Sequence, residues 1–294
     1  MTQAPTPPGD ELFDECDAIF VPRDGPVMHQ SEDYDPRHFE LLRRMQREHF
    51  WYRGRHRFVR AAVVRSLESL EVRPETLSAI DLGGGCGGWV NVLQEQGPRF
   101  RELALGDSSL EALRQAREAA PDSIRLYNVS LYDLPWNRRW DVVFLLDVLE
   151  HLADDAGALR QVARALNPGG LVFATAPALD RFWSRNDDLA GHRRRYSRAD
   201  MGSLGSRAGL EVLDTRYFMF FLSPILWASR RTPSWWTSRR DEQAHDVLER
   251  MHRVPAAPWN AALASAFGAE TPLGLYWRFP WGTSVLSIFR FPSS

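Results

Sequence analysis

The stretch from Ala79 to Trp89 constrains the fold more than any other part of this chain. It reads Ala-Ile-Asp-Leu-Gly-Gly-Gly-Cys-Gly-Gly-Trp, so an apolar run ends in five glycines within six positions. The amphipathic run from Trp89 to Leu93 follows, and the whole predicts a strand, a tight turn and a helix. Glycine allows positive φ and a close approach of a ligand to the backbone. The start of the helix offers free N–H groups to a carboxylate or phosphate.

Two glycine patterns overlap in this turn, and they predict different ligands. Gly83, Gly85 and Gly88 match G-x-G-x-x-G, the pattern of dinucleotide-binding turns. Asp81 with Gly83, Gly85 and Gly87 completes D-x-G-x-G-x-G. An acidic side chain at the strand tip would repel a pyrophosphate but suits a ligand that carries an ammonium group. Asp81 therefore favours the second pattern, and a turn that binds no ligand is the plain alternative.

Apolar segments alternate with helical patterns through the middle of the chain. The apolar segments are residues 77–82, 101–106, 123–130, 140–148 and 171–176, and the helical patterns are 89–93, 109–119 and 156–166. Such alternation predicts a parallel, doubly wound sheet with ligands at the carboxyl ends of its strands. Asn167-Pro168-Gly169-Gly170 is predicted to end the third of these helices before the fifth strand begins. The predicted strand ends carry Gly83 to Gly87, Asp107, Ser130, Asp147 to His151, and Pro177.

Together these motifs resemble those of class I S-adenosylmethionine (SAM)-dependent methyltransferases, over residues 49–217 and the last strand. D-x-G-x-G-x-G is similar to the first motif of that family, and Leu105-Gly106-Asp107-Ser108-Ser109 is similar to the second. The resemblance implies a Rossmann-like fold, SAM as cofactor and S-adenosylhomocysteine as product. It also implies the cofactor contacts Asp81, Gly83, Gly84, Gly85, Gly87, Asp107, Ser108, Ser130, Leu131 and Asp147.

Two of these cofactor contacts have specific alternatives. Asp107 follows the glycines at close to the spacing at which an acid binds ribose hydroxyls, although an Asp after a strand can also cap a turn. Ser130 stands where the resembling family usually has an acid that meets the adenine. The adenine contact therefore departs from the family pattern.

Two histidines are candidate catalytic residues. Methyl transfer from a sulfonium needs alignment and exclusion of water, and a hydroxyl acceptor also benefits from a base with a pKa near ~6.5. His151 follows the fourth strand in the pair Glu150-His151, which resembles a pair in many small-molecule methyltransferases. His192 lies in a later polar loop. The alternatives are that the Glu-His pair braces its loop and that His192 orients the substrate.

That polar loop ends in Gly191-His192-Arg193-Arg194-Arg195-Tyr196. Guanidinium groups bind phosphates and carboxylates bidentately, which makes the loop a candidate acceptor site. The predicted substrate-binding residues are Trp183, Arg194, Arg195 and Tyr196. The alternative is a solvated charge run that forms ion pairs with Asp187 and Asp188.

Four segments are expected along the chain. Residues 1–33 are rich in proline and acids and are expected to be flexible. Residues 34–217 should form the SAM-binding core with an N-terminal helical cover. Residues 218–283 form a helical, aromatic-rich insert that is far longer than a hairpin needs, and residues 284–294 hold the closing strand.

The expected fold is an α/β, doubly wound, seven-stranded sheet whose last two strands, 210–217 and 284–291, are antiparallel. Helices at 36–50 and 58–70 precede the sheet, with the aromatic cluster Phe50-Trp51-Tyr52 between them either in the core or in a lid. The insert is expected either to roof the acceptor pocket or to pack on the sheet. Its aromatic residues include Phe218, Phe220, Phe221, Trp227, Trp235 and Trp236.

The composition excludes several classes of function. A net charge of −2 gives no reason to expect nucleic acid, and no run of 18 apolar residues could span a membrane. The acidic, proline-rich start is not a secretory signal. Cys16 and Cys86 form no C-x-x-C pair, so no disulfide and no metal site is expected, and a cytoplasmic location fits. Peripheral membrane contact through the insert stays open.

These observations favour an enzyme that transfers a methyl group from SAM to an apolar small-molecule or lipid-linked acceptor, most simply by O-methylation. Two other functions use the same glycines: an NAD(P)-dependent oxidoreductase, and a SAM-binding accessory protein without catalysis. Oligomeric state and the methylated atom do not follow from the sequence.

Overall fold

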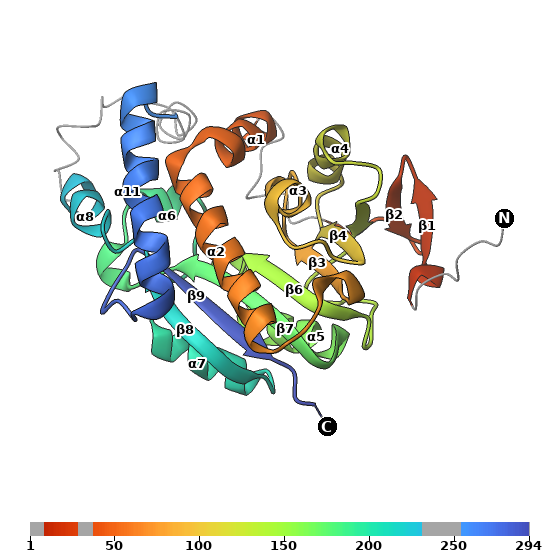
Figure 1. The fold of residues 1–294 in the computed structure, drawn as a ribbon. Helices are drawn as coiled ribbons and strands as arrows, with labels where there is room; N and C mark the ends of the chain where they lie inside the picture. The colour runs from red at the N-terminus through yellow and green to blue at the C-terminus, as the bar shows by residue number, and fades with distance from the viewer. Residues whose placement is uncertain (1–8, 29–37, 231–253, 294) are drawn as a thin grey trace.

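A nine-stranded sheet forms the centre of the computed structural model, which describes residues 9–28, 38–230 and 254–293 (Figure 1). The strand order is β1-β2-β5-β4-β3-β6-β7-β9-β8. The five central strands are parallel. Their bounds are β3 (Ser78–Leu82), β4 (Glu102–Asp107), β5 (Arg125–Asn128), β6 (Trp140–Leu146) and β7 (Leu166–Pro177).

The order of these strands places a topological switch point at the middle of the sheet. The chain runs outward from β3 to β4 and β5, then returns to β6 on the other side of β3. In open α/β sheets a ligand crevice forms at such a point, beyond the carboxyl ends of the strands. The doubly wound fold predicted from the sequence is confirmed.

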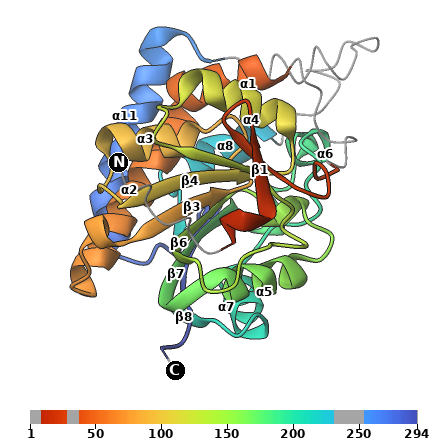
Figure 2. The same cartoon turned by 90° about the vertical axis from the view of Figure 1, so that its right-hand side faces the viewer.

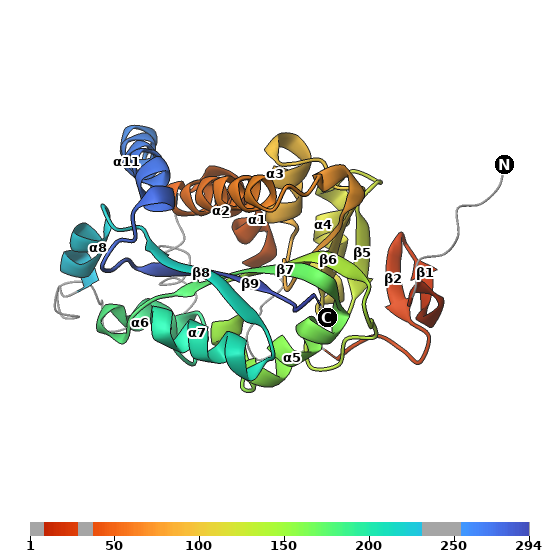
Figure 3. The same cartoon turned by 60° about the horizontal axis from the view of Figure 1, so that its bottom comes forward.

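Helices cover both faces of the sheet (Figure 3). On one face lie α2 (Phe50–Ser69), α3 (Gly88–Gln96) and α4 (Leu110–Ala119), and on the other α5 (Asp155–Ala165) and α7 (Arg198–Arg207). Alternate residues of β6 serve the two cores, because Val142 and Phe144 pack with α2 while Val143 and Leu145 pack with α5. All four side chains are fully buried, as expected of a central parallel strand.

The N-terminal segment corrects the sequence expectation. Residues within the 1–33 segment that was expected to be flexible form a hairpin of β1 (Phe13–Cys16) and β2 (Ile19–Pro22), and β2 pairs with β5. Figure 2 looks onto the edge of the sheet that carries this hairpin. Phe13 packs on Tyr127 and Trp136, and these contacts hold the hairpin to the edge. The sheet therefore has nine strands instead of the seven expected.

The start of β7 also differs from the expectation. The segment Asn167-Pro168-Gly169-Gly170 was expected only to separate a helix from a strand starting at Leu171, but it forms the first part of β7. A register shift against β6 between Trp140 and Val142 accommodates it, and Gly169 adopts a φ of 77°. At the other edge, β8 (Glu211–Phe218) and β9 (Ser284–Arg290) form the expected antiparallel pair.

Two helices of the insert are described, α8 (Ser223–Arg230) and α11 (Ala257–Tyr276). α11 lies along α2 (Figures 1 and 3), where the Asn260 amide accepts from Phe50 N–H at 2.9 Å and donates to the Glu48 carbonyl at 2.8 Å. Residues 231–253, with Trp235 and Trp236, lie outside the described residues. Within the part of the chain that is described, no helix is both long and apolar enough for a membrane crossing.

Candidate functional site

A cavity of about 500 Å³ opens beyond the carboxyl ends of β3 and β6. The glycine loop forms one wall, and α1 (His38–Glu48) with the first turns of α2 forms another. Residues 147–151 and the loop 186–195 complete the lining. Apolar side chains contribute much of the surface: Leu42, Met45, Phe50, Trp51, Trp89, Leu146, Leu189 and Leu226.

The glycine loop needs glycine for two separate reasons. Gly83, Gly85 and Gly87 have φ values of 73°, 57° and 77°, a region that other residues enter at a cost. A Cβ on Gly84 would lie 2.2 Å from Asp81 Oδ2, so this glycine lets the chain pass over the carboxylate. A Cβ on Gly85 would meet only Leu42, at 3.8 Å, because Gly85 faces the cavity.

Asp81 lies at the tip of β3, in the cavity wall and beneath the glycine loop. It is 1% exposed, and neither carboxylate oxygen has a hydrogen-bond partner within the described part of the chain. Burial and the neighbouring Asp107 charge raise its pKa to about 7. Since buried carboxylates are ordinarily paired, Asp81 is suited to receive a cationic ligand group such as an ammonium.

Asp107 at the end of β4 connects the glycine loop to the next helix. Its Oδ2 accepts from Gly85 N–H at 2.9 Å, and its Oδ1 accepts from Ser109 N–H at 2.8 Å. The predicted cap of α4 is confirmed, because Ser109 Oγ accepts from Ala112 N–H. Asp107 lies outside the cavity lining, along the same edge of the sheet, together with Ser108, Ser130 and Leu131.

A buried ion pair joins α2 to the end of β6. Arg55 donates to Asp147, the predicted cofactor contact, and both line the cavity. Thr175 Oγ1 donates to the other Asp147 oxygen at 3.1 Å. The guanidinium lies 5.1 Å and 5.0 Å from the ring centres of Trp51 and Tyr52. The aromatic cluster before the first central strand is thus part of the cavity wall.

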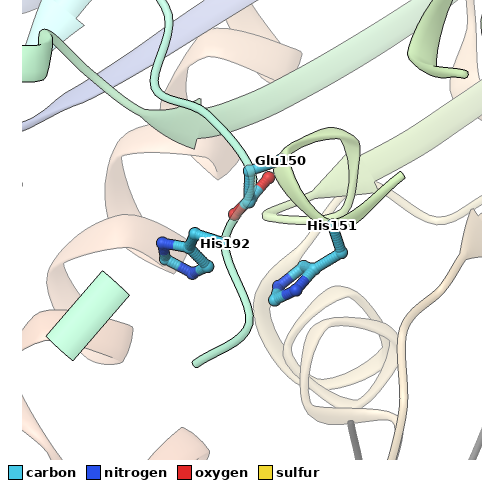
Figure 4. A group of neighbouring side chains, drawn as sticks. All are labelled: Glu150, His151 and His192. Carbon is cyan, nitrogen blue, oxygen red and sulfur yellow. The ribbon is translucent and has the colours of Figure 1, made fainter. Parts of the chain in front are cut away.

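The two predicted catalytic histidines lie side by side in the lining (Figure 4). His151 ends the short helix Leu149–His151, and His192 follows α6 (Arg185–Leu189). Their ring centres are 4.9 Å apart at 78°. His192 Nδ1 lies 2.9 Å from Asp187 Oδ1. Because an ionised carboxylate only accepts hydrogen bonds, Nδ1 carries the proton of this bond, and in the neutral imidazole the lone pair is therefore on Nε2.

Asp187, which orients His192, is itself held in place by hydrogen bonds from Ser184 and Arg195. It occupies the third position of a capping box, where its carboxylate accepts from Ser184 N–H at 2.8 Å. Arg195 donates to it through Nε and Nη2 at 2.9 and 2.7 Å. Burial alone would raise the pKa of Asp187, but the hydrogen bonds from His192 and Arg195 outweigh it and lower the pKa to about 2.

Glu150 completes the cluster from the sequence position before His151. It is 0% exposed, lines the cavity, and has no hydrogen-bond partner for either carboxylate oxygen among the described residues. Burial raises its pKa well above the ordinary value, and the negative charge of Asp147 adds to the shift. One ligand atom from each of Glu150, His151 and His192 lies within 4.8 Å of the others.

Most of the predicted substrate contacts lie outside the cavity. Tyr196 is buried, and its hydroxyl bonds the Leu149 carbonyl and Asp155 at 3.1 and 2.8 Å. Arg194 pairs with Asp155 at 2.9 Å, and the Trp183 indole donates to Asp188. Only Arg195 lines the cavity, with its guanidinium engaged by Asp187 and the Ala178 carbonyl. Two arginines of the basic loop are thus ion-paired in this structure, Arg194 with Asp155 and Arg195 with Asp187, whereas the alternative interpretation expected pairs with Asp187 and Asp188.

Changing Asp187 to Asn is expected to lower the free energy of unfolding by about 2 kcal/mol near pH 7. The native pKa lies below the unfolded one, so the ionised group stabilises the fold above about pH 4 and loses that contribution as the pH falls toward 2. Urea unfolding at several pH values measures this. The loss should shrink toward pH 2, and Asp188→Asn, at the exposed neighbouring position, should cause no comparable loss. An equal loss for Asp187→Asn at every pH would contradict this prediction.

Comparison with known proteins adds three findings. A family model described as "Methyltransferase domain" matches residues 44–215. The chain is 26% identical over 248 residues to a trans-aconitate 2-methyltransferase of an Azoarcus strain, covering 79% of this chain and 91% of that protein. It is 29% identical over 163 residues to a ubiquinone biosynthesis O-methyltransferase of Methylocella silvestris, covering 55% and 60%.

A solved structure extends the likeness of the fold over most of the chain. It is phosphoethanolamine N-methyltransferase 2 of Haemonchus contortus in complex with S-adenosyl-L-methionine. The TM-score is 0.55 at 12% identity, and the alignment covers 93% of this chain and 62% of that one.

Proposed function

The chain belongs to the methyltransferase-domain family and is a class I SAM-dependent methyltransferase, and from this premise we propose that it methylates a hydroxyl of an apolar small-molecule or lipid-linked acceptor. When bound, SAM supplies an activated methyl group on a sulfonium. The residues present fit this cofactor, because Asp81 is buried with no hydrogen-bond partner among the described residues, and Gly85 of the glycine loop faces the open cavity. We assign the amino acid end of SAM to Asp81 and Gly83 to Gly85, and its ribose to Asp107.

The pairing of His192 with Asp187 in the cavity wall carries the proposal for a hydroxyl acceptor. A hydroxyl is a weak nucleophile until it loses its proton. Two chemistries use a histidine that a carboxylate holds in one tautomer: the free nitrogen accepts the proton, or it binds a metal ion that acidifies the hydroxyl. Both require the Nε2 lone pair that Asp187 secures.

The charges of the lining argue against a polycarboxylate acceptor. Asp81, Asp147, Glu150 and Asp187 contribute carboxylates, while the arginines among the described lining residues, Arg55 and Arg195, are each paired with an aspartate. A carboxylate acceptor would find no unpaired guanidinium in this lining. A neutral hydroxyl and an apolar body fit the described surface better.

A panel of acceptors tests this function directly. The full chain is incubated with SAM and either phenols, long-chain alcohols, amines or polycarboxylates, and S-adenosylhomocysteine is quantified. We expect turnover with apolar hydroxyl compounds and little with polycarboxylates. Turnover restricted to carboxylates or amines would overturn the choice of acceptor, and binding of SAM without turnover on any class would favour an accessory role.

Changing Asp107 to Ala is expected to weaken SAM binding by about 1.5–3 kcal/mol, the usual cost of a lost charged hydrogen bond. The carboxylate also holds the Gly85 and Ser109 N–H groups, so its loss loosens the loop as well. Calorimetry with SAM measures the change. Asp122→Asn, at a fully exposed position beyond the end of α4, serves as a control. Unchanged affinity in Asp107→Ala would remove Asp107 from the cofactor site.

The insert gives a further prediction, since we propose that it helps select the acceptor. Leu226 of α8 lines the cavity, whereas α11 packs along α2. Hydrogen exchange should therefore slow in α8 when acceptor and S-adenosylhomocysteine are bound, and should stay the same in α11. Leu226→Ala should raise the acceptor KM, while Leu273→Ala on the exposed side of α11 should not. Exchange in α8 that ignores the acceptor, with an unchanged KM in Leu226→Ala, would leave only a packing role.

A further inference from the structure

We propose that Glu150, His151 and His192 bind one divalent transition-metal ion in the cavity wall, and that this ion activates the acceptor hydroxyl. The binding of the ion follows from the geometry of the three side chains. Its role rests on the proposed O-methylation. No metal site was expected from the sequence, because that expectation rested on the absence of C-x-x-C pairs. The three ligands proposed here come instead from two loops about 40 residues apart.

The three ligand atoms are close enough to share an ion. They lie within 4.8 Å of one another, and the side chains come from the end of the short helix after β6 and from the loop after α6 (Figure 4). Two histidines and one glutamate are a known ligand set of catalytic zinc, with ligand distances of about 2.0–2.2 Å. A point central to the three atoms is at most about 2.8 Å from each, so each atom would move inward by less than about 1 Å. Both histidines are only half-buried, which leaves room for this adjustment.

Glu150 gives an independent reason to expect a cation here. Its side chain is 0% exposed, and neither oxygen has a hydrogen-bond partner among the described residues. A buried carboxylate is costly unless it is paired, hydrogen-bonded or coordinated to a metal. The nearby guanidiniums of Arg55 and Arg195 are already bonded to Asp147 and Asp187. Coordination of a cation would neutralise the buried charge of Glu150 and would also give its carboxylate oxygens a partner.

The surroundings of His192 match those of a metal-binding histidine. Metal-ligating imidazoles ordinarily donate their other N–H to a carboxylate or carbonyl, which fixes the ring and raises its basicity. His192 makes this bond to Asp187 at 2.9 Å. Asp187 is in turn fixed by Arg195 and Ser184. The Glu150 and His151 carbonyls accept from Arg193 at 2.8 and 3.0 Å, which ties the two ligand loops together.

The ion would act on the acceptor as such ions act on bound water, by lowering the pKa of a coordinated hydroxyl. The O–H proton passes to solvent water, and the oxygen electron pair forms the new bond to the methyl carbon. The C–S bond breaks with its electron pair on sulfur. A sulfonium and an alcohol thus become a thioether, a methyl ether and one proton. Two imidazole ligands favour Zn²⁺, or Co²⁺ in its place, over Mg²⁺ and Mn²⁺, which prefer oxygen ligands.

Binding is tested on the full chain without SAM or acceptor. The chain is freed of metal with a chelator, dialysed, and titrated with Co²⁺ or Zn²⁺ by calorimetry, with Co²⁺ absorption as a second readout. We expect one ion per chain. Glu150→Gln and His151→Ala should each weaken binding by at least about tenfold, because the loss of an outer partner alone costs about 10–100-fold. Glu111→Gln, the same change at a half-buried position on α4 outside the cavity lining, should bind like the wild type.

The outcomes separate the ion site from the proposed function. No stoichiometric binding by the wild type, or equal binding by Glu150→Gln with circular dichroism unchanged, overturns the site. Turnover on hydroxyl acceptors that survives removal of the ion overturns its role and leaves O-methylation standing. Stoichiometric binding without turnover on any hydroxyl acceptor supports the site and counts against O-methylation.

Discussion

Changing His192 to Ala is expected to lower turnover by about 10²–10⁴-fold while the affinity for SAM changes little. The imidazole lies in the cavity wall with Nδ1 on Asp187, so its other nitrogen is the one prepared for the acceptor or for an ion. The expected loss is the same for both chemistries, because each depends on that lone pair. Steady-state kinetics with a hydroxyl acceptor, together with calorimetry for S-adenosylhomocysteine, measure the two quantities separately.

Two further variants locate the effect. Asp187→Asn keeps the shape of the side chain but no longer demands the Nδ1–H tautomer, so turnover should fall by about tenfold or more. His151→Ala tests the other candidate histidine. If His192→Ala turned over nearly as fast as the wild type while His151→Ala was inactive, the activating role would move to His151. If both retained activity, an acceptor that needs no deprotonation would be indicated.

The central sheet was predictable because its signals are local. A strand buried on both faces must be an apolar run, and residues 140–148 are one, so β6 is visible without knowledge of its neighbours. The left-handed φ values of Gly83, Gly85 and Gly87 likewise require glycine at those positions. A serine directly before a helix, such as Ser109, is likewise a local signal that predicts the N-terminal cap of that helix.

The N-terminal hairpin was missed because its stability comes from distant residues. Asp10 accepts from the Tyr127 hydroxyl at 3.0 Å and pairs with Arg125, and Phe13 packs on Trp136. The prolines and acids of the first 33 residues outweighed these few apolar side chains in the composition. Composition alone cannot show that a segment adds strands to the edge of a sheet.

The sequence named some of the residues that line the cavity, but not how they are arranged. His151 and His192 were both proposed, yet only the structure brings their rings to 4.9 Å and assigns Asp187 to His192. The sequence treated Asp187 as a surface partner of arginines and gave Glu150 no role of its own. The structure changes both interpretations because the two acids are buried: Asp187 is 1% exposed and Glu150 is 0% exposed. The one local signal that could have pointed to Glu150 is its position directly before His151.

Changing Gly85 to Val is expected to abolish measurable SAM binding while the fold persists. A Cβ at this position points into the cavity, where nothing but Leu42 lies within 4 Å, so the added side chain would occupy ligand space instead of clashing with the protein. The backbone φ of 57° makes valine costly there, by roughly 1–2 kcal/mol or somewhat more for a β-branched residue. That strain must be separated from the loss of ligand space.

Gly209 provides the matched control. It has a φ of 77° after the end of α7, and a Cβ there would meet no atom within 4 Å, so Gly209→Val carries similar strain away from the cavity. We expect both variants to lose a similar amount of thermal stability and only Gly85→Val to lose SAM binding in calorimetry. Gly85→Ala should bind with intermediate affinity, because a methyl group fills less of the space. Normal binding by Gly85→Val, or an equal loss in Gly209→Val, would show that the glycine loop does not hold the cofactor as assigned.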